Sequence, residues 1–226
     1  MSKISVLMSV YKKENPEYLR ASLESILVQT RTADEILLIE DGPLTQELYQ
    51  VVAEYQKKCD YLHVHAMEQN VQLGRALAKG VELCQYDLIA RMDTDDIAMP
   101  DRLEKEEAYM EAHPEVDVVG GAIREFNDEG TIDRVKNMPK TQEEILEYVK
   151  VRNPLNHMTV MYRKDSILKA GNYKFSISGG LFAMEQDVVT GISVQEHGRY
   201  TCPGENKHGI SKAKKWMGLL QGFSKT

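Results

Sequence analysis

The sequence predicts an α/β protein with a mostly parallel central sheet and helices on both of its faces. Short apolar runs rich in β-branched residues alternate along the chain with longer segments in which apolar residues recur at helical spacing. This alternation is typical of βαβ units, because parallel strands are joined by helical crossovers. With 226 residues, 42% of them hydrophobic, the chain can form one domain with a sizeable core, or one domain plus an extension.

Four strands are expected in the N-terminal half. The run Ile4–Val10 is short, apolar and rich in β-formers, and Pro16 after it suits the first turn of a helix. The run Glu35–Ile39 stops at Asp41-Gly42-Pro43, which is a strong turn signal. Two further strands are expected at Leu62–Ala66 and Leu88–Met92, and helices at about 16–27, 45–58 and 73–84.

The pattern beyond residue 100 is less regular. Pro100 and Asp101 open a helix that should run to about His113, and 116–126 is strand-like. A polar loop is expected next, followed by a helix at 142–151, a strand at 157–162 and a short helix at 164–170. Ligands of open α/β sheets bind at the carboxyl ends of the strands, so residues just past strand ends are the first candidates for function.

Composition narrows the functional class. The formal net charge of −7 argues against general nucleic-acid binding, although an acidic protein can bind an anionic nucleotide through a bridging metal ion. Three widely spaced cysteines without a CxxC pattern argue against a disulfide framework or a zinc site. The N-terminus is too short and polar for a signal peptide. We therefore expect a cytoplasmic protein, and contact with the inner face of the membrane is left open.

The acidic cluster after the fourth strand is the strongest candidate site. Asp93, Asp95 and Asp96 follow the apolar run directly, and carboxylates are hard oxygen ligands that suit Mg²⁺ or Mn²⁺. Asp93 and Asp95 should point the same way on an extended segment. A metal held there could bridge two phosphate groups. The alternative is that these acids cap the next helix, where Asp is also favoured.

Other candidates carry weaker signals. Asp41 ends a strand, but Asp-Gly also occurs in turns for purely local reasons. Arg75 opens a helix beside Gly74 and could meet a phosphate, although an arginine on a helix face is more often only solvated. A lone histidine such as His157 is usually structural. A dinucleotide-dependent oxidoreductase is disfavoured, because no G-x-G-x-x-G follows the first strand.

Several motifs, in order and in spacing, resemble those of the family 2 glycosyltransferases. They are 6–12 (VLMSVYK), 39–42 (IEDG), 70–74 (NVQLG) and 90–96 (ARMDTDD). A further stretch, 153–163 (NPLNHMTVMYR), looks like the bacterial capsule and exopolysaccharide branch. The resemblance covers about Ile4 to Tyr173, which places one domain at 1–175 and an atypical segment at 176–226.

The resemblance implies a GT-A fold and the transfer, with inversion, of a sugar from a nucleoside-diphosphate-sugar donor to a saccharide or lipid-linked hydroxyl acceptor. Asp41 would then contact the nucleobase, and Asp93 and Asp95 would frame the metal and the donor sugar. Tyr11 and Glu14 would line the base and ribose pocket. The same resemblance implies a role in cell-surface polysaccharide synthesis.

Two departures from the family pattern stand out. Lys79 replaces an asparagine that many relatives carry, so no polar role is assigned there. The resemblance also implies a Glu-Asp pair after the last of these motifs, whose aspartate is the general base. Residues 176–226 contain no adjacent Glu-Asp pair, and the acids that come closest to that pattern are Glu185 and Asp187. The sequence therefore assigns no catalytic residue.

Residues 176–226 also differ in composition. They hold 8 of the 15 glycines and a net charge of +2, against −9 for the rest of the chain. A one-base shift of the reading frame lets 179–187 read EDYLLWNRM, which restores the family motif, with tryptophan forced at Met184. We expect a frameshifted, poorly packed tail, the alternative being a divergent but genuine C-terminal segment.

Two functional hypotheses remain. One is an active glycosyltransferase whose tail supplies an unrecognised base. The other is a catalytically impaired, nucleotide-sugar-binding remnant that lost its base.

Overall fold

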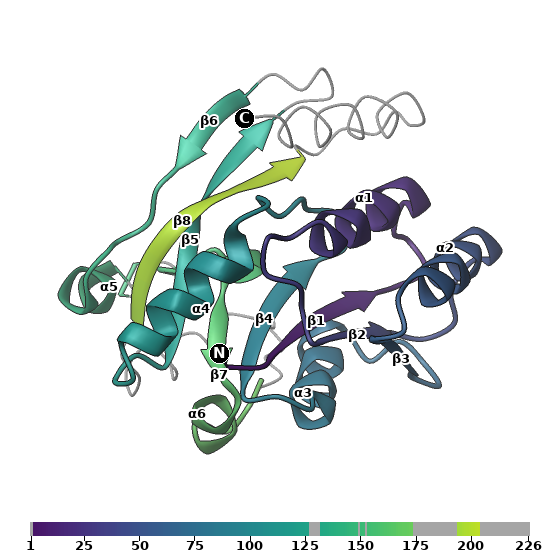
Figure 1. The fold of residues 1–226 in the computed structure, drawn as a ribbon, viewed down its shortest axis with the longest axis horizontal. Coiled ribbons are helices and arrows are strands. Elements are labelled where there is room, and N and C mark those ends of the chain that lie inside the picture. The colour runs from purple at the N-terminus through teal and green to yellow at the C-terminus, as the bar shows by residue number, and fades with distance from the viewer. Residues whose placement is uncertain (1, 127–131, 149, 152, 174–193, 204–226) are drawn as a thin grey trace.

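The computed structural model describes residues 2–126, 132–148, 150–151, 153–173 and 194–203. Its strands form a single mixed sheet in the order β3-β2-β1-β4-β7-β5-β6, with β8 pairing with β5 (Figure 1). The strands are β1 (Ile4–Val10), β2 (Glu35–Glu40), β3 (Leu62–Ala66), β4 (Leu88–Asp93), β5 (Val118–Phe126), β6 (Ile132–Lys136), β7 (Met161–Arg163) and β8 (Val194–Pro203).

Helices cover both faces of the sheet. One core cluster joins the sheet to α1 (Pro16–Leu27), α2 (Gln46–Lys58) and α4 (Arg102–Ala112). The other joins it to α3 (Leu73–Leu83), α5 (Gln142–Tyr148) and α6 (Lys164–Lys169). This layering confirms the predicted α/β class with helices on both faces.

The alternation of side chains along β1 explains the two layers. Val6, Met8 and Val10 pack into the cluster beneath α1, whereas Leu7 faces α3. All four are completely buried. Successive side chains of a strand point to opposite faces, so an apolar run with both faces covered fits a central strand.

The parallel part of the sheet places the candidate residues at one edge. β1 lies between β2 and β4 and is parallel to both, and β2 is parallel to β3. The register pairs Val10 with Glu40 and Ser9 with Asp93. Residues that follow β1, β2 and β4 therefore meet where these three strands end.

The expected strand at 157–162 is partly wrong. A 3-10 turn occupies His157–Thr159, and β7 begins only at Met161 and pairs antiparallel with β4. The Thr159 backbone N–H donates to the Asn156 carbonyl (2.8 Å), and the Thr159 hydroxyl bonds the same carbonyl (2.7 Å). These local bonds compete with strand formation.

Two strands were not expected. β6 lies in the segment predicted as a polar loop and pairs antiparallel with β5. β8 lies within the atypical segment 176–226 and runs parallel to β5. Residues 174–193 and 204–226 lie outside the described residues, so the expectation of a poorly packed, frameshifted tail stays a prediction. Among the described helices, none combines the length and apolar character needed to cross a membrane.

A buried arginine of α4 forms an ion pair within its own helix and a hydrogen bond to β4. The Arg102 side chain is 1% exposed and that of Glu106 is completely buried, with Nε and Oε2 3.2 Å apart. Nη2 of Arg102 also donates to the carbonyl of Arg91 on β4 (2.7 Å). One guanidinium thus holds the helix that follows the acidic loop against the strand that precedes it.

Removal of this cation should be strongly destabilising. Arg102→Met removes the positive member of a buried ion pair, and loss of one partner of such a pair costs ~3–5 kcal/mol of unfolding free energy. The double variant Arg102→Met/Glu106→Leu should recover part of that loss, because it removes both members of the pair. Urea unfolding of both variants checks this. A double variant less stable than the single one would contradict it.

Candidate functional site

Polar side chains of α1 and of the segment that follows it hold the loop that carries the aspartates. The Ser22 hydroxyl, on α1, donates to the backbone carbonyl of Asp93 (2.7 Å). Gln29 lies just beyond the C-terminal end of α1, and its side chain donates to the carbonyl of Met99 (2.7 Å) and accepts from the N–H of Leu103 (3.1 Å). Both ends of the loop are therefore hydrogen-bonded to α1 or to the residues directly after it.

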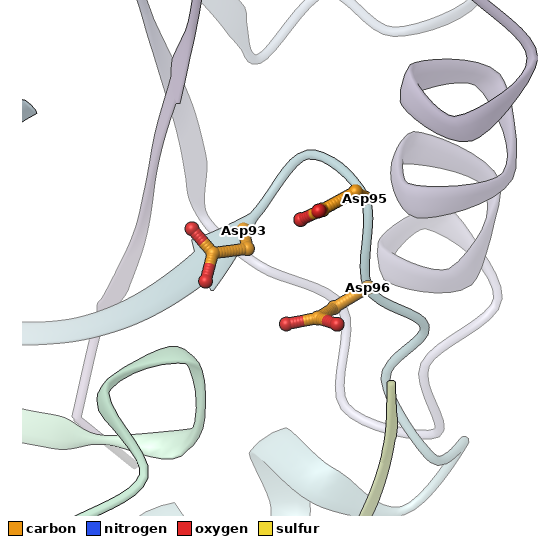
Figure 2. A group of neighbouring side chains, drawn as sticks. All are labelled: Asp93, Asp95 and Asp96. Atoms are coloured by element: carbon orange, nitrogen blue, oxygen red, sulfur yellow. The ribbon is translucent and has the colours of Figure 1, made fainter. Parts of the chain in front are cut away.

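The three aspartates converge. One carboxylate oxygen from each of Asp93, Asp95 and Asp96 lies within 4.8 Å of the others. Figure 2 shows the side chains of Asp95 and Asp96 extending from the loop toward the side on which Asp93 ends its strand. The chain turns at Thr94 and Asp95, so the expected extended conformation is wrong. The turn nevertheless gathers the carboxylates.

The alternative, in which these acids cap the next helix, is wrong. Helix α4 begins at Arg102 and its N-cap residue is Asp101, several residues beyond the cluster. The cluster therefore needs another explanation. Its donor set of hard oxygens fits a divalent cation such as Mg²⁺ or Mn²⁺.

Crowding and burial disfavour ionisation of two nearby acids. Asp95 is the most exposed of the three aspartates, but its carboxyl group is partly buried. This burial, and to a smaller extent the charge of Asp93, raises the pKa of Asp95. Burial likewise raises the pKa of Glu14, despite hydrogen bonds from the Thr94 hydroxyl (2.6 Å) and the Asn15 N–H (2.8 Å). A bound cation would favour the charged forms of these acids.

Asp41 fastens a neighbouring loop. Its side chain is buried and accepts from the N–H of Val71 (2.6 Å) and from the side-chain amide of Asn70 (2.9 Å). Gly42, next in sequence, has φ of +83°, and a Cβ atom there would lie 2.5 Å from the backbone nitrogen of Asn70. The Asp-Gly pair thus serves both as the predicted turn and as an anchor for the loop after β3.

These residues line one pocket of about 410 Å³. Four of its lining residues are acids and none is Lys or Arg. The lining residues are Ser9, Tyr11, Glu14, Asp41, Asn70, Gln72, Leu73, Asp93, Thr94 and Asp95. An anionic ligand would meet a strongly negative surface here unless a cation accompanied it.

The pocket gathers most of the predicted nucleotide and metal residues. Tyr11, Glu14, Asp41, Asp93 and Asp95 all line it, although these positions alone do not test their roles. Two other candidates are absent from its lining. Arg75 lies in the first turn of α3, and His157 is buried with its Nε2 2.9 Å from the hydroxyl of Tyr173.

Sequence reasoning gave no role to half of the lining. Asn70, Gln72 and Thr94 lay inside the recognised motifs, and that position was the available signal. Nothing in the sequence indicated the positive φ of 74° at Gln72, because this backbone angle favours glycine. Ser9 reads as one more residue of the first strand.

The fold and the site define a GT-A glycosyltransferase domain. Its backbone matches TarS from S. aureus, residues 1–349, with a TM-score of 0.70 at 18% identity, covering 89% of this chain and 60% of that one. The sequence matches the family described as "Glycosyl transferase family 2" over residues 5–174. The chain belongs to that family.

Two bacterial glycosyltransferases are similar to this chain over about three quarters of its length. "Amylovoran biosynthesis glycosyltransferase AmsE" of Erwinia amylovora is 44% identical over 170 residues, covering 75% of this chain and 63% of the relative. An uncharacterized glycosyltransferase of Haemophilus influenzae is 46% identical over 173 residues, covering 76% of this chain and 64% of the relative. This chain thus spans less than two thirds of the length of these relatives.

A third relative names a donor and an acceptor. "UDP-Gal:alpha-D-GlcNAc-diphosphoundecaprenol beta-1,3-galactosyltransferase" of Escherichia coli is 35% identical over 177 residues, covering 76% of this chain and 62% of the relative.

Gly42→Ala should destabilise the pocket. Both the positive φ and the clash with the Asn70 backbone oppose a methyl group, so a loss of more than ~1 kcal/mol in unfolding free energy is expected. Gly120→Ala is the control, because a Cβ atom there meets its nearest neighbours at an ordinary 3.5 Å. Thermal and urea unfolding of both variants measure the difference. Equal losses would remove the special role of Gly42.

Proposed function

We propose that this chain binds a nucleoside-diphosphate-sugar donor together with Mg²⁺ or Mn²⁺ in the pocket at the carboxyl ends of β1, β2 and β4. The transfer would invert the anomeric centre, pass the sugar to a saccharide or lipid-linked hydroxyl acceptor and contribute to cell-surface polysaccharide synthesis. A cytoplasmic location, with contact at the inner face of the membrane, belongs to the same proposal. The converging carboxylates of Asp93, Asp95 and Asp96 are the observation that carries it.

Charge supports a metal-linked donor. The pocket lining offers an anionic diphosphate no Lys or Arg, whereas three carboxylate oxygens lie within 4.8 Å of one another. When bound there, a divalent cation would neutralise the charge that develops on the departing nucleoside diphosphate. Asp93 and Asp95 would hold the cation, and their negative charge would be offset by it.

Other residues that line the pocket suit a nucleoside. The Tyr11 side chain is 44% exposed, and an exposed aromatic ring can stack on a base. Asp41 lies at the end of the adjacent strand, and its carboxylate can accept from the edge of a base in addition to the bonds it already makes. Glu14, held by Thr94, would accept from the ribose.

Arg75 belongs to the proposed nucleotide-binding set only because it lies at the start of α3. It is absent from the lining, so a phosphate contact would require its side chain to turn toward the ligand. The N-terminal end of a helix favours an anion nearby. Arg75 is therefore the weakest member of the proposed nucleotide-binding set.

The catalytic base has no assigned residue. The acceptor hydroxyl is a poor nucleophile until a base removes its proton, and the acids that line the pocket already have roles as proposed ligands of the metal and the nucleoside. Glu185 and Asp187 lie outside the described residues. The second candidate function, a nucleotide-sugar-binding remnant without efficient transfer, rests on this missing base.

Asp95→Ala should abolish metal-dependent nucleotide binding, because it removes a carboxylate from the proposed cation site. Calorimetric titrations of UDP, GDP and dTDP, each with and without Mn²⁺, measure this. The control is Asp101→Ala, which removes an acid at the N-cap of α4 that does not line the pocket. Binding that survives in Asp95→Ala would sink the metal proposal.

The tail is tested with two versions of the chain. A one-base correction that restores EDYLLW should increase sugar transfer by ~10²–10⁴-fold, the usual value of general-base help. Both versions should bind the donor equally, because residues 5–174 contain the pocket. Transfer is measured with the same donor and a panel of lipid-linked and saccharide acceptors. Equal turnover would show that the uncorrected chain has its own base.

A further inference from the structure

A buried arginine contacts the acidic cluster. Arg91 is 1% exposed, and its Nη2 donates to Oδ1 of Asp93, two residues further along β4. Side chains two apart on a strand share a face, which is why the two groups meet. The guanidinium nitrogens Nε and Nη1 have no hydrogen-bond partner among the described residues. Arg91 and Asp93 therefore form a buried ion pair on β4.

Stability does not account for such a residue. A buried ion pair loses about as much hydration as it gains in attraction, and well-packed apolar side chains often replace such pairs with no loss. Arg91 also leaves two donors without hydrogen bonds within the described residues, a further cost. The surrounding core, which includes Leu7 and Ile89, would accommodate a methionine. The advantage of an arginine must lie in what it does to Asp93.

The neighbouring His157 side chain carries no positive charge. Burial and the nearby Arg91 hold the pKa of His157 well below its usual range, so that imidazole stays neutral. Its Nε2 is 2.9 Å from the Tyr173 hydroxyl. Arg91 is thus a buried cation in direct contact with one of the three carboxylates, that of Asp93.

We propose that Arg91 is a positioning residue for the cation site. By holding Oδ1 of Asp93, it fixes the rotation of that carboxylate and leaves Oδ2 for the metal. It also offsets one of the three negative charges, which allows the aspartates to stay close together before a metal arrives. The inference rests on the proposed function, because it concerns the same metal.

The experiment measures Mn²⁺ affinity rather than activity. Free Mn²⁺ is followed by electron paramagnetic resonance during titration of the full chain. Each titration contains whichever of UDP, GDP and dTDP the unmodified chain binds in the calorimetric experiment. Arg91→Met should bind Mn²⁺ about 10-fold or more weakly, as expected when a charged hydrogen bond is lost. Arg91→Lys, which keeps the cation, should recover part of the affinity.

A matched control separates positioning from general destabilisation. Arg163→Met removes another arginine of the same sheet. Arg163 pairs with Leu88, at the end of β4 away from Asp93, and its side chain donates to the carbonyls of Val116 and Met110. It should lower the melting temperature without changing Mn²⁺ affinity. Should Arg91→Met fail to fold, Arg91→Gln replaces it, with the same expectation.

The outcomes distinguish the two proposals. If the unmodified chain shows no Mn²⁺-dependent nucleotide binding, the proposed function fails and this inference fails with it. If the unmodified chain binds but the Arg91 variants bind Mn²⁺ equally or more tightly, only the positioning role of Arg91 is overturned. A loss of affinity in Arg163→Met as large as in Arg91→Met would also overturn it.

Discussion

The parallel pairing of β1 with both β2 and β4 is the constraint on which the rest of this molecule depends. Parallel neighbours end at the same edge, so Tyr11, Asp41 and Asp93 are brought together although they are far apart in sequence. Apolar residues on both faces of β1 hold this arrangement, because each face is covered by helices. The pocket is thus a consequence of strand order rather than of any single loop.

The electrostatics of that edge set the chemistry. Four acids line the pocket, and Arg91, which contacts Asp93, is buried and is not part of the lining. The result is a surface that attracts a divalent cation and, through it, an anionic diphosphate. Ser22 of α1 and Gln29 just after that helix are equally important, since their hydrogen bonds hold the loop that gathers the carboxylates.

Sequence patterns predicted most of the parallel sheet and the acidic cluster, because apolar runs and strand-end acids are local signals. Ile4–Val10 and Leu62–Ala66 agree with the structure residue for residue. The 3-10 turn at His157–Thr159 was missed because hydrogen bonds from Thr159 override an apolar pattern. The pocket role of Gln72 could not be predicted, since it depends on a backbone angle imposed by the fold.

The bonds that Asp41 makes to Val71 and Asn70 carry a consequence for ligand preference. They tie the loop after β3 to the end of β2, so this side of the pocket is preorganised and little conformational entropy is lost when a ligand arrives. The same rigidity limits adaptation. A change of nucleobase would have to be accommodated by side chains such as Tyr11, because moving the loop would break the bonds that hold it.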